Sequence, residues 1–148
     1  MSGADYVEIY KKASLIRQTD KRFMDVIASG RIATPYYSPA GQELIPSAIS
    51  SLLGKDDYVV TIYRGMHDQL AKGVPLKLLW AEIAGKVTGT CKGKGGAMHI
   101  THPASGVMVT TGIVGSGLPI ANGLAWASQL DGNDRVTVRY RSWAPGLG

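Results

Sequence analysis

Apolar side chains recur at steps of three and four residues along the first part of the chain. The residues that follow this spacing are Tyr6, Tyr10, Ala13, Ile16, Phe23 and Ile27. They predict an amphipathic helix over residues 4–29, which Gly30 is placed to end. Two prolines and a glycine make residues 31–43 a loop, and a second helix is expected over residues 42–53, with Pro46 in its first turn.

Short runs of β-branched and aromatic residues follow. YVVTIY (58–63) and RVTV (135–138) are typical of buried strands, and VMVTT (107–111) of an extended segment. Two short helices are expected on either side of Gly73, and a longer one from about Leu118, after a turn rich in glycine. This alternation of helices and strands predicts a three-layer α/β domain with a largely parallel sheet.

The composition is that of one globular domain. The chain has 148 residues, of which 45% are hydrophobic and 18% charged, so disorder is not expected. It shows no secretory signal pattern and no apolar run of about 18 residues, and we expect no membrane segment. The single cysteine, Cys91, fits a reducing compartment, and we expect a cytoplasmic protein. The net charge of +5 suits an anionic ligand, although solubility alone would also explain it.

Residues 88–99, TGTCKGKGGAMH, combine glycines with lysines. Glycine lets main-chain N–H groups converge on an anion, and Lys92 and Lys94 add positive charge, so the segment has the parts of an anion site. A flexible surface connection would have the same composition. The P-loop spacing GxxxxGK[ST] is absent, and no nucleic-acid binding is expected, because the basic residues are few and lack interleaved aromatics.

Two further segments carry candidate chemistry. In GIVGSGLPIANG (112–123), the main chain of a bend of small residues could hold the edge of a flat heterocycle, and close packing of a helix on a strand is the alternative. In YRG (63–65), Arg64 follows a predicted strand, at the edge where α/β sheets bind ligands. Its planar guanidinium suits phosphate oxygens, with Tyr63 as a second donor, although an ordinary surface ion pair would also use an arginine.

Together these segments resemble the alpha subunit of thiamine-diphosphate-dependent 2-oxo acid (pyruvate-type) dehydrogenases and acetoin dehydrogenases. The matching text is YRGMHDQLAKG, LWAEIAGKVTGTCKGKGGAMHI and TTGIVGSGLPIANGLA, in this order. The resemblance covers about residues 5–138. It implies that residues 1–138 are the amino-terminal part of a doubly wound, thiamine-diphosphate-binding fold, truncated here, and that residues 139–148 are an atypical tail.

The resemblance also implies a site. Tyr63 and Arg64 would contact the diphosphate. The main chain of Gly112 and Val114 would hydrogen-bond the aminopyrimidine ring, and the side chains of Ile113 and Val114 would pack beside it. The KGKGG loop would lie near the cofactor, with its glycines folding the backbone around the diphosphate site. No catalytic residue is assigned in this chain, because the glutamate that activates the cofactor belongs to a partner beta subunit.

The implied reaction is covalent catalysis by the cofactor. The substrate would be a small 2-oxo acid such as pyruvate, or acetoin, and the acyl group would pass to lipoyl carriers. The implied partners are the beta subunit, in an α2β2 assembly, and a lipoyl-bearing acyltransferase. The loop sequence CKGKGGAMHI favours the pyruvate or acetoin type, but the residues do not decide the substrate.

Several positions depart from the pattern of this family. Tyr37 and Met66 stand where histidines are usual, and His67, one position later, either replaces such a histidine or lies on the surface. His99 either faces the site or is a structural histidine. RYRSWAPGLG (139–148) stands where Gly-Asp-Gly and a later asparagine would supply the Mg²⁺ ligands, so we expect no metal ligands in this chain.

Three functional interpretations follow. In the first, the chain is a thiamine-diphosphate-dependent dehydrogenase subunit, or a truncated part of one that is inactive alone. In the second, it is an inactive fragment that only binds a partner subunit, and in the third, it is a simple anion-binding module that binds diphosphate without magnesium. A tail produced by a frameshift would favour the first interpretation, and a genuine tail the second. An open sheet edge and uncovered helix faces also predict aggregation unless another chain covers them.

Overall fold

The amino-terminal helix is the longest element. The structure, a computed structural model, describes residues 3–141 of the chain, and α1 spans Gly3–Ala28. Ala13, Ile16 and Phe23 are buried as the spacing predicted, but Tyr6 and Tyr10 are exposed and Ile9 is the buried residue at that end of α1. No helix within the described residues, α1 included, combines the length and the apolar character that crossing a membrane requires.

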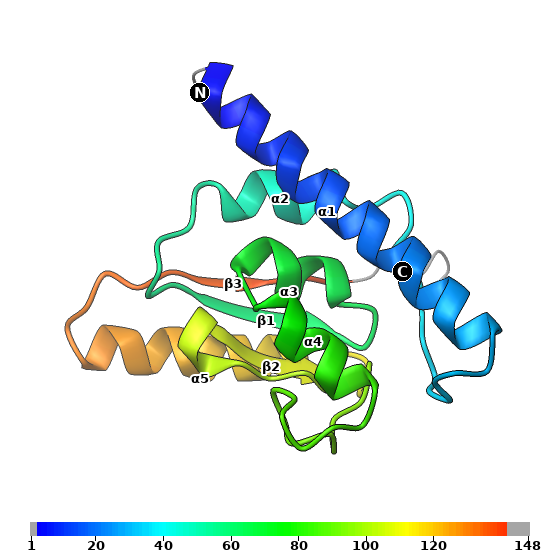
Figure 1. Cartoon of the computed structure of the whole chain (residues 1–148). Helices are drawn as coiled ribbons and strands as arrows, with labels where there is room; N and C mark the ends of the chain where they lie inside the picture. Colours follow the sequence, from blue (N-terminus) through cyan, green and yellow to red (C-terminus); the bar gives the residue numbers. More distant parts are fainter. Residues whose placement is uncertain (1–2, 142–148) are drawn as a thin grey trace.

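Within residues 3–141, three parallel strands form the sheet. β1 (Tyr58–Ile62) is central, with β2 (Val107–Thr111) on one side and β3 (Thr137–Arg139) on the other. β1 pairs in parallel with both neighbours. The carboxyl ends of all three strands therefore point to the same edge of the sheet (Figure 1). The expected parallel sheet is confirmed.

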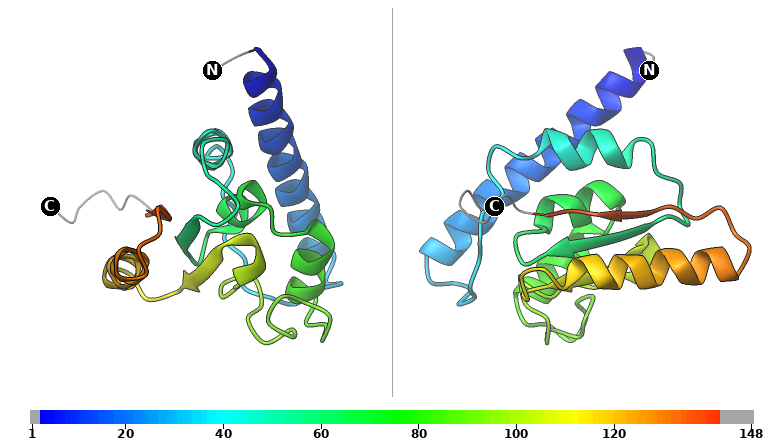
Figure 2. Two further views of the ribbon diagram at one scale, coloured as in Figure 1. Left: turned by 90° about the vertical axis from the view of Figure 1, so that its left-hand side faces the viewer. Right: turned by 180° about the vertical axis from the view of Figure 1, so that it is seen from behind.

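Helices cover both faces of this sheet. α3 (Met66–Lys72) and α4 (Leu76–Ile83) lie on the same side as α1, and α5 (Gly117–Leu130) lies on the opposite side (Figure 2). α2 (Leu44–Ser50) packs against α1 and α3. A short 3₁₀ helix, η1 (Pro103–Ser105), precedes β2. The predicted three-layer α/β architecture is confirmed in a small form.

The core lies between the sheet and the layer of α1, α3 and α4. Its buried cluster consists of Ile16, Phe23, Met66, Leu70, Ala71, Val74, Leu79, Ile83, Ala97, Ile100 and Val107. The ring of Phe23 contacts the Trp80 ring edge-on, with 4.0 Å between centroids, and the Tyr36 ring at 5.6 Å. These aromatic contacts tie α1 to α4 and to the loop that follows α1.

The second helix is shorter than the sequence suggested. We expected it over residues 42–53, but α2 spans Leu44–Ser50. The hydroxyl of Ser51 donates a hydrogen bond to the Ala48 carbonyl at 2.7 Å, and the chain turns at this point. Side-chain bonds of this kind compete with the helical ladder, and the spacing of apolar residues does not reveal them.

The last strand begins later than predicted. We expected a strand over residues 135–138, but β3 spans Thr137–Arg139. The N–H group of Val136 donates to the Asp57 carboxylate at 2.8 Å, which fixes the approach to the sheet just before β3 begins. Of the atypical tail, the first three positions belong to the described part, and residues 142–148 lie outside it.

Candidate functional site

Two of the predicted site segments follow neighbouring strands. Tyr63 and Arg64 come directly after β1, and Gly112 comes directly after β2. The register pairs Ile62 with Thr111, so the two segments leave the sheet side by side. They do so at its carboxyl edge, where open α/β sheets bind ligands. The structure thus brings together the segments that the sequence predicted as one site.

Arg64 is half-buried and contacted from several sides. Its Nη1 donates to the Ser38 carbonyl at 3.1 Å. Its Cζ lies 5.7 Å from the centre of the Tyr37 ring and 5.9 Å from the centre of the Tyr63 ring, and the two rings pack edge to face at 4.9 Å. These contacts orient the guanidinium and leave further N–H donors for an anion.

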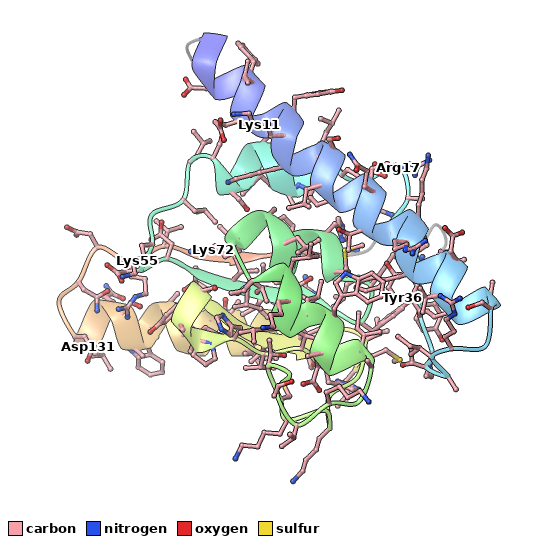
Figure 3. The ribbon with its side chains drawn as sticks, viewed as in Figure 1. Lys11, Arg17, Tyr36, Lys55, Lys72 and Asp131 are labelled. Atoms are coloured by element: carbon pink, nitrogen blue, oxygen red, sulfur yellow. The ribbon has the colours of Figure 1, made fainter. Side chains whose placement is uncertain are left out.

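Asp20 of α1 fixes the loop that carries Tyr37. Its buried carboxylate accepts hydrogen bonds from the Tyr36 hydroxyl at 2.7 Å and from Ser38 Oγ at 2.8 Å. Figure 3 shows Tyr36 beside the carboxyl-terminal half of α1. Burial, together with the hydrogen bond to Asp20, raises the pKa of Tyr36 well above its usual value, so the phenol remains a donor. The helix thereby positions Tyr37 against Arg64.

Gly65 permits the sharp turn from β1 into α3. A Cβ atom at this position would stand 2.6 Å from Thr61 Cγ2 and 2.7 Å from the Ile62 carbonyl oxygen, which is too close for any side chain. The N–H group of Gly65 itself donates to the Ile62 carbonyl at 2.7 Å. Because the turn is this tight, Arg64 stays at the end of β1 while α3 begins two residues later.

Residues 112–116 form a bend that its own hydrogen bonds hold. The N–H of Ile113 donates to Thr111 Oγ1 at 3.1 Å, and the Ser116 hydroxyl donates to the Ile113 carbonyl at 2.8 Å. Neither of these hydrogen bonds uses the main-chain N–H or C=O groups of Gly112 and Val114. The side chains of Ile113 and Val114 are 73% and 82% exposed. The bend therefore presents an apolar pair and main-chain groups that have no partner within residues 3–141, which suits the edge and face of a flat ring.

The glycine-rich loop binds an anion that belongs to the chain itself. The Glu82 side chain in α4 is fully buried and accepts four main-chain hydrogen bonds of 2.7 to 3.2 Å, from Cys91, Gly93, Gly95 and Gly96. The expectation that these glycines fold the backbone around a diphosphate was wrong, because the carboxylate of Glu82 occupies their N–H groups. The two lysines of the loop are exposed.

The histidines differ in their surroundings. His67 is buried in α3, so the surface alternative was wrong, and burial lowers its pKa to about 4. His99 is exposed, and its ring lies against Gly112, where a Cβ atom would be 3.2 Å from His99 Cε1. His102 contacts the Ser105 hydroxyl at 2.8 Å beside the amino end of β2. Among the histidines, His99 is the one that reaches the bend.

A buried acid near this edge was not predicted. Asp68 is 1% exposed and accepts a hydrogen bond from the Thr61 hydroxyl of β1. Burial raises its pKa to about 8, so Asp68 is mostly neutral at pH 7, as is His67, whose Nε2 lies 3.4 Å from Asp68 Oδ1. Together with Ile62 and Tyr140, this pair lines a cavity of about 60 Å³.

A larger hollow lies away from these groups. An open groove of about 760 Å³ runs between α1 and residues 40–44, with Tyr10, Arg17 and Glu43 in its walls. None of the predicted site residues lines it. Charged and main-chain hydrogen-bond donors gather instead at the ends of the strands. We therefore locate the candidate site by these donors and not by the volume of the groove.

Comparison with known proteins shows the family of the chain. A profile of the dehydrogenase E1 component family matches residues 10–141. The chain belongs to the dehydrogenase E1 component family. The alpha subunit of the pyruvate dehydrogenase E1 component from Rickettsia bellii is 32% identical to it over 136 residues, which are 92% of this chain and 42% of the relative. The resemblance to pyruvate-type alpha subunits is confirmed.

An acetoin oxidoreductase subunit and a plant pyruvate dehydrogenase subunit are similar to the same degree. The alpha subunit of acetoin:2,6-dichlorophenolindophenol oxidoreductase from Bacillus subtilis is 34% identical over 132 residues, which are 89% of this chain and 40% of the relative. A chloroplastic pyruvate dehydrogenase E1 component subunit alpha-3 from Arabidopsis thaliana is 32% identical over 123 residues, or 83% and 29% of the two chains. The chain thus spans about two fifths or less of the length of these relatives.

Sequence reasoning missed the side chains that support the candidate site. The signal for Glu82 was present, because it lies between Leu79 and Ile83 on the apolar face of α4, where a carboxylate needs a buried partner. Asp20 gave no local signal, because its partners Tyr36 and Ser38 belong to the loop after α1, and the spacing of residues in a helix carries no information about contacts with a loop. Asp68 follows a histidine in a helix of mixed character, and only the fold shows that both are buried.

Proposed function

We propose that this chain is the cofactor-binding part of an E1 alpha subunit that depends on thiamine diphosphate. With a beta subunit, it would decarboxylate a 2-oxo acid such as pyruvate, or cleave acetoin, and pass the acyl group to a lipoyl-bearing acyltransferase. The observation that carries the proposal is the pairing of Ile62 with Thr111, from which the segment of Arg64 and the bend of residues 112–116 leave neighbouring strands at the same edge of the sheet. Membership of the E1 family and the names of the pyruvate and acetoin relatives support it.

The groups at the sheet edge fit the two ends of thiamine diphosphate. Arg64, oriented by two tyrosine rings, would hold phosphate oxygens through charge-assisted hydrogen bonds. The main-chain groups of Gly112 and Val114 would bond the aminopyrimidine edge, and the exposed side chain of Ile113 would exclude water from its face. When bound, the cofactor supplies the nucleophilic carbon for cleaving a bond next to a carbonyl group.

A magnesium site does not fit the described residues. Within residues 3–141, no group of three or more histidine, cysteine or acidic side chains is arranged to hold a metal ion. The chain leaves β3 through Arg139, Tyr140 and Arg141, which are cationic or phenolic side chains. A hard dication requires oxygen ligands, chiefly carboxylates and carbonyls. We therefore propose that residues 1–138 provide the cofactor contacts and that the metal ligands come from outside this chain.

A second candidate function is binding to a partner subunit without catalysis. Its support is the outer surface of α5, where Leu118, Trp126 and Leu130 are 55%, 67% and 75% exposed. Exposed apolar surface on one helix is typical of a protein interface. In this candidate the chain pairs through α5 and does not bind the cofactor.

Calorimetric titration with thiamine diphosphate separates the two candidates. The full chain should bind the cofactor weakly, with little difference between EDTA and magnesium buffers, because no group of three or more histidine, cysteine or acidic side chains within residues 3–141 is arranged to hold a metal ion. Arg64→Ala should weaken this binding about tenfold to a hundredfold, since a hydrogen bond to a charged group contributes about 1.5–3 kcal/mol.

Arg22→Ala is the matched control, because Arg22 is an exposed arginine of α1. It should bind thiamine diphosphate as the unaltered chain does. Equal binding by Arg64→Ala and the unaltered chain would contradict the proposed diphosphate contact. No binding by the unaltered chain would contradict the first candidate and leave the second.

A further inference from the structure

Glu82 takes no part in the proposed cofactor contacts, yet a whole loop is built around it. Its Oε2 accepts the N–H groups of Cys91 at 2.7 Å and Gly93 at 2.9 Å. Its Oε1 accepts those of Gly95 at 2.7 Å and Gly96 at 3.2 Å. No lysine or arginine within residues 3–141 forms an ion pair with it. Four converging main-chain dipoles therefore take the place of water around a buried carboxylate.

The loop is packed too closely to be a flexible connection. A Cβ atom on Gly93 would lie 2.5 Å from the carbonyl carbon of Gly85, and one on Gly95 would lie 2.5 Å from the His99 oxygen. Lys92 has a φ of 58°, in the left-handed region that residues with side chains rarely adopt. A conformation of this kind persists only when other interactions impose it, and the four bonds to Glu82 do so.

Two of the residues that Glu82 holds also contact His99. The thiol of Cys91 donates to the His99 carbonyl at 3.4 Å, and Gly95 lies so close to the same carbonyl that a Cβ atom on it would be 2.5 Å from the oxygen. The imidazole of His99 lies against Gly112. Neither of its ring nitrogens has a hydrogen-bond partner within residues 3–141. A continuous set of contacts thus runs from Glu82 through the loop to the bend at the sheet edge.

We propose that Glu82 is a positioning residue. Its carboxylate is the internal anion around which residues 88–99 fold, and through Cys91 and Gly95 it holds the His99 imidazole against Gly112. The importance of this bend for a cofactor rests on the proposed function, whereas the ordering of the loop does not. Glu82 acts on the site without touching the histidine ring.

Hydrogen exchange and NMR of the full chain test the proposal. Glu82→Gln fills the same space but turns an NH₂ group toward main-chain donors. The four amides bonded to Glu82 should then exchange about tenfold to a hundredfold faster, because hydrogen bonds to a charged group are lost. Amides of β1 should keep their protection, and the His99 Hε1 resonance should move. Glu8→Gln, an exposed acid paired with Lys11, is the control and should change neither signal.

Chemical rescue distinguishes positioning from a general loss of stability. In Glu82→Ala, formate should bind in the space that the Glu82 carboxylate leaves between the four N–H groups. It should restore the protection of these amides from exchange and return the His99 Hε1 resonance to its original position. Chloride at the same ionic strength should restore neither the protection of the amides nor the His99 resonance. Unchanged loop exchange or an unchanged Hε1 signal in Glu82→Gln would overturn the proposal, even if Glu82→Ala does not fold. Uniform loss of protection across loop and sheet, with no response to formate, would also overturn it.

Binding of thiamine diphosphate is a separate readout. If the unaltered chain binds it, Glu82→Gln should bind it more weakly, and formate should recover binding in Glu82→Ala. If the unaltered chain binds none, the proposed function fails. The exchange rates and the His99 Hε1 signal still decide the role of Glu82 in that case, so the two failures can be told apart.

Discussion

At the scale of single residues, Asp68 and His67 form a neutral pair next to the candidate site. Burial raises the pKa of Asp68 from 3.8 to about 8 and lowers that of His67 from 6.5 to about 4. Near pH 7 the folded chain therefore keeps a proton on Asp68 that the unfolded chain releases. The stability of the fold should depend on pH through this pair.

The free energy of unfolding should fall as the pH rises from 6.5 to 8. Between about pH 4 and 6.5 the two groups act in opposite directions, because unfolded His67 binds a proton that the folded form excludes. Above pH 6.5 Asp68 acts alone, and each pH unit should cost up to about 1.4 kcal/mol. Urea denaturation of Asp68→Asn, which is neutral at every pH, should show no such fall.

Asp134→Asn provides the control for this experiment. Asp134 is exposed, so the variant should lose stability between pH 6.5 and 8 as the unaltered chain does. The same pH dependence in Asp68→Asn and in the unaltered chain would show that Asp68 does not hold a proton in the folded state.

At the scale of elements, the sequence predicted the helices and strands that depend on the pattern of their own residues. α1 follows from the spacing of its buried residues, and β1 from a run of β-branched and aromatic residues. The predicted end of α2 and the predicted start of β3 were wrong, because single polar contacts of Ser51 and Asp57 fix these boundaries. The glycine loop was expected to hold a diphosphate or to be a flexible connection, and its composition does not reveal that it binds the carboxylate of Glu82.

α5 exposes several large apolar side chains. Its buried residues are Gly117, Ala121 and Ser128, whereas large apolar side chains such as Trp126 face outward. We predict that the chain alone associates through this surface, because the burial of aromatic side chains favours association. Trp126→Glu should shift the chain toward the monomer in sedimentation velocity, and its stability should change by less than about 0.5 kcal/mol.

Gln129→Glu is the control for the α5 surface. Gln129 is exposed on the same helix, so this variant adds the same negative charge without removing apolar area. It should associate nearly as the unaltered chain does. Association that is equal in Trp126→Glu and the unaltered chain would show that α5 is not the contact surface.

At the scale of the whole molecule, the two sides of the sheet differ. The side of α1, α3 and α4 holds the core cluster, and the other side has α5 with its exposed outer surface. β2 and β3 form the outer edges of the described sheet, and unpaired strand edges also invite association. The chain covers about two fifths of the alpha subunits that it resembles, so its activity belongs to a larger assembly in our proposal.

The location of the candidate site could be predicted because its motifs adjoin strands. Parallel pairing sends the ends of neighbouring strands to one edge, and this rule put Arg64 at the ligand-binding edge of the sheet, while the family resemblance joined it with the bend that begins at Gly112. The supporting contacts could not be predicted in this way. Asp20 reaches Tyr36 and Ser38 across the fold, and such tertiary contacts leave no periodic pattern in the sequence.

The central claim is that Arg64 and the bend of residues 112–116 form one binding site. The most direct measurement is an NMR titration of the ¹⁵N-labelled full chain with thiamine diphosphate. The amides of Arg64, Gly112 and Val114 should shift together and report a single dissociation constant. Shifts at Arg64 without shifts at Gly112 and Val114, or different dissociation constants for the two segments, would contradict the account.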